Sequence, residues 1–144
     1  MKITFVVSGS IRSNFSYRPL VLAKELKKLG HDVRIIAPIA DKYNDFVPEY
    51  IADIDGVTIV QPFQFKTKSL ILNLFPYMVS ATVALLRQKS DLIYIYKPTP
   101  VSVIGLFAKL FYSTHIVTDF DDLGSEVMRI EGHPIYIRKL VEWS

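Results

Sequence analysis

The sequence contains no cysteine, and this absence excludes two kinds of chemistry at once. The protein forms no disulfide bond, and no thiolate is present to hold a metal ion. Because reduced and oxidised compartments both contain cysteine-free proteins, the absence says little about location. Glycine is also scarce, with six residues in 144, and this scarcity bears on which phosphate-binding loops the chain can form.

Long uninterrupted apolar runs are missing as well. The first run, Ile3 to Val7, is too short for the hydrophobic region of a secretory signal peptide. The longest, Leu70 to Leu86, is broken by polar residues and by Pro76, and it falls short of the roughly 18 clean apolar residues that a spanning helix needs. We therefore expect a cytoplasmic protein, at most peripheral at the inner face of the membrane.

The loop after the first apolar run lacks the common nucleotide-binding signatures. A dinucleotide fingerprint needs glycines at fixed spacing, but Gly9 has no glycine partner at Ile11 or Asn14. No Gly-Lys-Ser or Gly-Lys-Thr follows, so a Walker A loop is absent. Nicotinamide, flavin and nucleoside triphosphate binding in this loop are therefore not expected.

The charge balance is mild. Seventeen basic and fourteen acidic residues give a net charge of +3, without the basic stripe of a nucleic-acid-binding protein. Half of the residues are apolar and the mean hydropathy is +0.26. This excess indicates buried parallel strands or an apolar face for something outside the chain.

The residues that are present open with a βαβ pattern. Ile3 to Val7 predicts a strand, and Val33 to Ala37 predicts a second strand that is covered on both faces. Between them, an amphipathic helix follows a first-turn Pro19 and ends at Gly30. The stripe expected to be buried on this helix consists of Leu22, Leu26 and Leu29.

The rest of the chain continues the alternation of strands and helices. Three more parallel strands are expected at Val57 to Val60, Leu92 to Tyr96 and Ile116 to Thr118, with helices at Pro76 to Gln88 and from Pro100 to Tyr112. Ala40 to Gly56 is interpreted as a loop with helical turns around Glu49 to Ile54, and Phe63 to Lys68 as a surface loop. The predicted fold is an α/β, Rossmann-like doubly wound parallel sheet with strand order 3-2-1-4-5 and helices on both faces.

The helix and the strand that follows it carry a family resemblance. The spacing of Arg18, Leu22, Ala23, Leu26, Gly30, His31 and Val33 resembles the N-terminal domain of GT-B glycosyltransferases, especially retaining family 4. A later segment resembles the same family at Asp119, Phe120, Asp122, Leu123 and Gly124, with Asp121 where a histidine is common. Any amphipathic helix that ends at a glycine before a buried strand would supply most of the first set.

The acidic segment Asp119 to Asp122 has several possible interpretations. It shares an Asp, any residue, Asp pattern with haloacid dehalogenases, but the Gly-Thr that should follow is absent. It also matches the metal-binding pattern of GT-A glycosyltransferases, although the opening unit is of GT-B type. A purely structural role is open too, in which Asp119 anchors backbone amides while Asp121 and Asp122 cap the next turn.

Topology predicts where a site should form. Strands one, four and five should be adjacent, so their carboxyl ends bring together the loops Ser8 to Arg12, Lys97 to Thr99 and Asp119 to Gly124. By the resemblance, the catalytic candidates are Asp121 and Asp122, and no metal is needed. The acceptor-binding candidates are Gly9, Ser10, Arg12, Arg18, Lys97 and Asp119.

The resemblance implies that residues 1–144 are one acceptor-side domain of an enzyme that transfers a sugar from a nucleotide-sugar donor to an acceptor hydroxyl with retention. The chain ends in mid-helix at Ser144, so the donor-binding C-terminal domain is expected beyond it, and this domain alone should be inactive and hold no cofactor. Expected partners are a sugar or lipid-linked acceptor and, weakly, a membrane surface near Phe63 to Lys68, with no nucleic acid. The alternative is a stand-alone α/β binding module whose Asp cluster holds Mg²⁺ or phosphate, although Val7 to Arg12 lacks the carboxylates of a receiver domain.

Overall fold

The computed structural model describes residues 1–11, 17–38, 46–47, 50–65, 70–97 and 103–119. The strands are β1 (Lys2–Val7), β2 (Asp32–Ile36), β3 (Phe46–Val47), β4 (Tyr50–Ile54), β5 (Val57–Gln61), β6 (Gln64–Phe65), β7 (Leu92–Tyr96) and β8 (His115–Asp119). The helices are α1 (Tyr17–Lys28), α2 (Leu70–Gln88) and α3 (Val103–Phe111). None of these three helices is long and apolar enough to cross a membrane.

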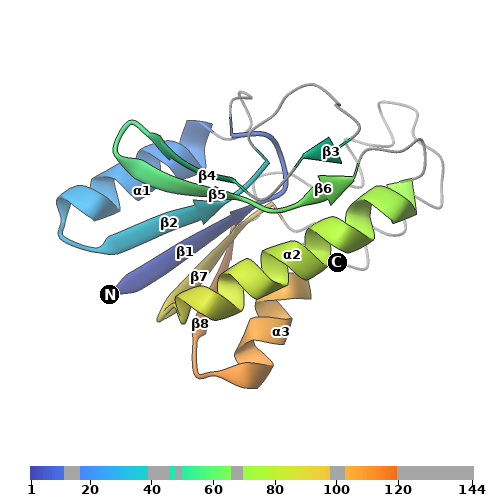
Figure 1. Cartoon of the computed structure of the whole chain (residues 1–144). Coiled ribbons are helices and arrows are strands. Elements are labelled where there is room, and N and C mark those ends of the chain that lie inside the picture. Colours follow the sequence, from blue (N-terminus) through green and yellow to red (C-terminus); the bar gives the residue numbers. More distant parts are fainter. Residues whose placement is uncertain (12–16, 39–45, 48–49, 66–69, 98–102, 120–144) are drawn as a thin grey trace, which may run out of the picture.

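Six strands form the main sheet in the order β4-β5-β2-β1-β7-β8 (Figure 1). The pairs β5–β2, β2–β1, β1–β7 and β7–β8 are all parallel, as expected for buried strands joined by helical crossovers. The predicted order of the five parallel strands is confirmed. Their predicted positions are also confirmed, with small shifts at the ends.

The edge strand β4 corrects the prediction of helical turns around Glu49 to Ile54. It pairs antiparallel with β5 through a turn at Asp55 and Gly56, whose φ angles are 52° and 82°. Two consecutive positive φ angles are typical of a tight hairpin turn, for which Asp-Gly is a preferred pair. The turn is held by the amide of Gly56, which donates to Asp53 Oδ1 at 2.7 Å. The Asp-Gly signal should therefore have outweighed the weak helical pattern.

A second, two-stranded sheet also lies where loops were expected. β3 and β6 pair antiparallel, with Phe46 opposite Phe65. The expected surface loop Phe63 to Lys68 is therefore partly strand, and residues 66–68 lie outside the described part of the chain.

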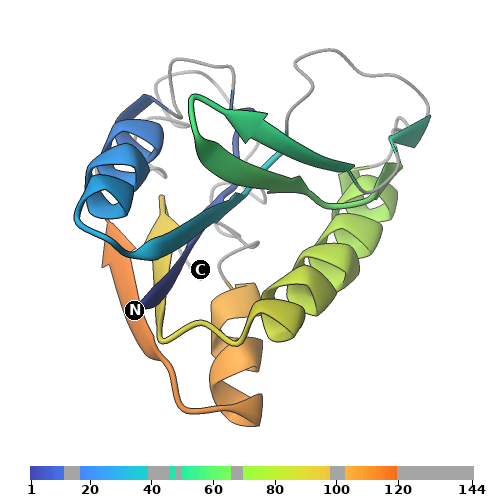
Figure 2. The same cartoon turned by 60° about the vertical axis from the view of Figure 1, so that its left-hand side comes forward.

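Helices cover both faces of the sheet, as predicted. Figure 2 shows α1 on one side of the strands and α2 with α3 side by side on the other. Under α1, the core is built on Phe5, Ile35 and Ile59, which are fully buried. Under α2 and α3, Leu85 and Ile104 pack on Ile93 of the sheet. Successive side chains of a strand point to opposite faces of the sheet, so these buried apolar strands supply one hydrophobic core on each face.

Two helix predictions need correction. Leu29 is 74% exposed, because α1 ends at Lys28 and Gly30 takes a φ of 86° that turns the chain away. Leu22 and Leu26 are partly buried and pack against the core, as predicted, beside the buried Pro19 and Ala23. Helix α2 begins at Leu70, and Pro76 lies inside it rather than at its start. A proline inside a helix costs about 3 kcal/mol. Burial of Tyr77, and of further α2 residues after it, against the sheet offsets that cost.

Candidate functional site

The carboxyl ends of three neighbouring strands meet at one edge of the sheet. Strand register places Val7 of β1 opposite Tyr96 of β7, and Tyr96 opposite Asp119 of β8. The ends of these three strands therefore lie side by side, as the topology predicts. This convergence is the geometric basis of the candidate site.

Asp119 is the best-defined polar group at this edge. Its carboxylate Oδ2 lies 3.4 Å from the guanidinium Nη2 of Arg18, at the start of α1. The same oxygen accepts a hydrogen bond from the phenol of Tyr94, two residues before the end of β7. Two acceptor-binding candidates, Arg18 and Asp119, are thus brought together from opposite ends of the described chain.

Sequence reasoning missed Tyr94 as a site residue. Burial raises its pKa to about 12, and the hydrogen bond and negative charge of Asp119 add to the shift. The phenol is therefore protonated at neutral pH and donates to the carboxylate. Tyr94 lies between buried Ile93 and Ile95, and the pairing of β7 with β8 places it on the same sheet face as Asp119.

Lys97 directly follows β7 and adopts a φ of 58°, in the left-handed region. Its amide donates to the carbonyl of Asp119 at 3.2 Å, which ties the ends of β7 and β8 together. Its ammonium lies 5.7 Å from the ring centroid of Tyr96, within the range of a cation–π contact. An unusual backbone conformation at a strand end is a common feature of binding sites.

The segment after β1 is anchored at its far end. Gly9 and Ser10 are half-buried, whereas Ile11 is buried and its amide donates to the carbonyl of Pro38 at 2.7 Å. Two further candidates, Gly9 and Ser10, therefore belong to a segment fixed to the chain beyond β2.

The remaining candidates, Arg12, Asp121 and Asp122, lie outside the described residues. The convergence of the three loops predicts that Arg12 and Lys97 face Asp121 and Asp122 across one cleft, and this stays a prediction. Within the described ranges, no three acidic or histidine side chains come close enough together to hold a metal ion.

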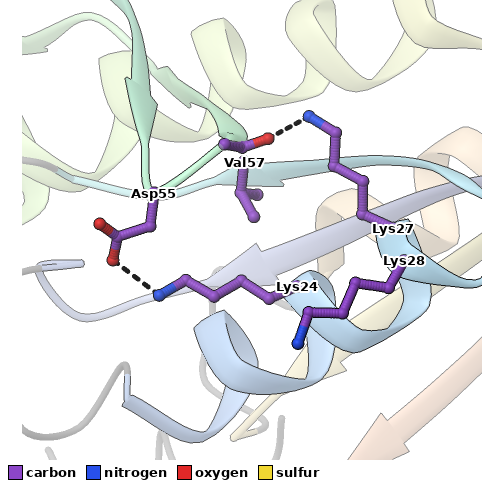
Figure 3. Close-up of a pocket in the computed structure, with 6 residues that line it drawn as sticks. Lys24, Lys27, Lys28, Asp55 and Val57 are labelled. Carbon is purple, nitrogen blue, oxygen red and sulfur yellow. Dashed lines mark hydrogen bonds and ion pairs between the residues drawn. The ribbon is translucent and has the colours of Figure 1, made fainter.

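A separate hollow of about 300 Å³ lies at the opposite, amino end of the sheet (Figure 3). It is lined by α1 lysines and the β4–β5 turn. Lys24 pairs with Asp55 at 2.6 Å, Lys27 donates to the carbonyl of Gly56, and Lys28 pairs with Glu25 at 2.7 Å. Because each ammonium has a protein partner, the hollow is a helix-to-hairpin contact rather than an anion site.

Comparisons with known proteins bear on the fold. No family model matches the chain, and no curated protein matches it. Among solved structures, the chain is similar to a sucrose-phosphate synthase from Thermosynechococcus elongatus, with a TM-score of 0.65 at 10% sequence identity. The match covers 99% of this chain and 39% of that protein. At this identity the likeness concerns the fold alone: the chain has a Rossmann-like α/β fold similar to that of a domain of this synthase.

Proposed function

We propose that residues 1–144 form the acceptor-side domain of a retaining, family 4-like GT-B glycosyltransferase. The observation that carries this proposal is the structural likeness to a sucrose-phosphate synthase over nearly the whole chain. The chain spans 39% of that protein's length, and we propose that a second domain beyond Ser144 binds the nucleotide-sugar donor.

In this proposal the acceptor binds at the carboxyl edge of β1, β7 and β8. The segment around Gly9 and Ser10 supplies amides and a hydroxyl to the acceptor, and Lys97 supplies a cation for a phosphate or hydroxyl of the acceptor. Asp119 is held by Arg18 and Tyr94, so it fixes the point from which the acidic segment starts.

One of Asp121 and Asp122 then orients the acceptor hydroxyl and takes up its proton. The acceptor oxygen forms the new bond to the anomeric carbon of the donor sugar, the bond from that carbon to the diphosphate breaks, and the nucleoside diphosphate leaves. We propose that the reaction retains the anomeric configuration and needs no metal. The acceptor is a sugar or a lipid-linked sugar used in carbohydrate or cell-envelope synthesis in the cytoplasm.

The test is transfer by the intact protein, supplied with a panel of nucleoside diphosphate sugars and simple glycoside acceptors. We expect release of the nucleoside diphosphate to depend on the acceptor, to persist in EDTA, and to give a product with the donor's anomeric configuration by NMR. Residues 1–144 alone should release none. Absence of release with every donor, or an intact protein without a second Rossmann-like domain, would contradict the proposal.

A further inference from the structure

The outer surface of α2 is apolar. Phe75, Val79 and Val83 recur at every fourth residue, which places them along one side of the helix. Their exposed fractions are 68%, 49% and 39%. The buried side of α2, at Ala81 and Leu85, lies roughly opposite and faces the sheet. The helix is therefore apolar on two sides, of which the sheet covers one.

The outer surface of α3 has the same character. Leu106, Phe107, Leu110 and Phe111 are all exposed, up to 78% at Leu110. The two helices pack against each other on one face of the sheet, as Figures 1 and 2 show. Since both turn their buried residues to the same sheet, their exposed sides look outward together. Isolated exposed apolar residues are normal, but seven on two packed helices form a patch of the kind used for interaction.

The charges on α2 and α3 and on the sequence that flanks these helices are nearly all of one sign. From residue 62 to residue 118 the sequence holds six lysines and arginines and a single acidic residue, Asp91. Neither α2 nor α3 contains an acidic residue, and each has a basic residue in its last turn, Arg87 and Lys109. By contrast, the α1 side of the molecule mixes both signs.

We infer that the outer face of α2 and α3, which we call the α2–α3 face, docks on an anionic lipid bilayer. Apolar side chains flanked by cations, on two helices that contain no acidic residue, fit the boundary between acyl chains and anionic headgroups. A second copy of the chain fits this face less well, because both copies would contribute the cations Arg87 and Lys109 to the interface and neither helix has an acidic residue to pair with them. The inference does not depend on the proposed glycosyl transfer.

The experiment is co-sedimentation of the intact protein with vesicles of phosphatidylcholine, with and without phosphatidylglycerol, in low salt and in 0.5 M NaCl. Binding should need the anionic lipid and should weaken in high salt, since screening shortens the reach of surface charge to a few ångströms. Arg87→Gln and Lys109→Gln should each lower the partition coefficient by about fivefold. Leu110→Gln with Phe111→Gln should lower it by about tenfold or more.

Leu29→Gln is the matched control for the apolar substitutions, because Leu29 is 74% exposed but follows α1, on the other side of the sheet. Lys28→Gln is the matched control for the charges. Both controls should bind vesicles like the parent. The inference is overturned if the controls weaken binding as much as the α2–α3 substitutions, or if the parent ignores anionic vesicles. It is also overturned if the α2–α3 substitutions convert a dimer to a monomer without changing lipid binding.

Discussion

Arg18 and Asp119 form an ion pair of 3.4 Å that joins the first turn of α1 to the last residue of β8. A cation at a helix N-terminus is unfavourable with respect to the helix dipole, so the carboxylate compensates for the position of Arg18. The two side chains differ in solvation, with 57% of Arg18 but only 12% of Asp119 exposed. The hydrogen bond from Tyr94 therefore stabilises the Asp119 carboxylate more than the ion pair with the Arg18 guanidinium does.

Tyr94→Phe should destabilise the protein more than Arg18→Gln. Loss of a hydrogen bond to a poorly solvated carboxylate costs about 1.5–3 kcal/mol, whereas an ion pair whose cation is more than half exposed contributes at most about 1 kcal/mol. The free energy of unfolding in urea measures both. Tyr17→Phe is the control, since Tyr17 is 72% exposed on α1. A larger loss for Arg18→Gln than for Tyr94→Phe would contradict this ordering.

Alkaline pH should remove part of the stability. Burial raises the pKa of Tyr94 from 10.0 to about 12, with a further contribution from Asp119. Because the folded state holds the phenol proton more tightly than the unfolded state, this contribution is complete below pH 10 and is lost as pH rises through about 12.

Urea unfolding at a series of pH values should therefore show the free energy of unfolding falling in that window. Tyr112, whose pKa is also raised, chiefly by burial, acts in the same direction. The fall in the free energy of unfolding should be shallower in Tyr94→Phe than in the parent. It should be intermediate in Asp119→Asn, which removes the carboxylate partner of Tyr94 but leaves the phenol partly buried. Equal declines in all three proteins would show that Tyr94 does not contribute.

Gly105→Ala tests the close packing of α3 on the sheet. A Cβ at this position would lie 2.8 Å from Cδ1 of buried Ile95, so a well-packed side chain must move. The gain in helix propensity is about 1 kcal/mol, and overpacking costs about 1–3 kcal/mol, so we expect a net loss of stability. In an Ile95→Val background, which lacks Cδ1, the same substitution should become neutral or stabilising. A loss of equal size in both backgrounds would rule out this contact as the cause.

Much of the fold could be predicted because buried parallel strands and amphipathic helices leave strong patterns. The five parallel strands and their order follow from continuous apolar runs and right-handed crossovers. The edge strand β4 could not be predicted in this way, because it is short and its apolar residues around Ile51 and Ile54 are only partly buried. The start of α2 was misplaced because tertiary burial outweighed the local cost of Pro76.

The candidate site was harder to predict. Topology brings Asp119 to the same edge as the end of β1, but its contact with Arg18 needs the position of α1 across the sheet. No local pattern encodes such a distance. Tyr94 was passed over because an aromatic residue in a strand is usually core, and only its pairing across to β8 reveals the phenol as a donor.

Comparison of Lys97→Gly with Lys97→Ala distinguishes backbone strain at this position from a role of the Lys97 ammonium in acceptor binding. The φ of 58° at Lys97 costs a non-glycine residue about 1–2 kcal/mol, so Lys97→Gly should be more stable than Lys97→Ala by about 1 kcal/mol. Both variants lack the ammonium. If that group binds the acceptor, both should raise the acceptor KM alike, whatever their melting temperatures. A raised KM in only the alanine variant would instead indicate a backbone effect.

Asp121→Asn and Asp122→Asn test the proposed chemistry directly. If one carboxylate orients the acceptor hydroxyl or accepts its proton, the corresponding amide, which cannot act as a base, should lower kcat by about 10²-fold or more in the intact protein. The donor KM should change little, because the donor binds to the second domain in our proposal. Asp32→Asn is the matched control, since Asp32 begins β2 at the amino end of the sheet. If both variants transfer sugar at the parental rate, the acidic segment is a capped turn and another group must activate the acceptor.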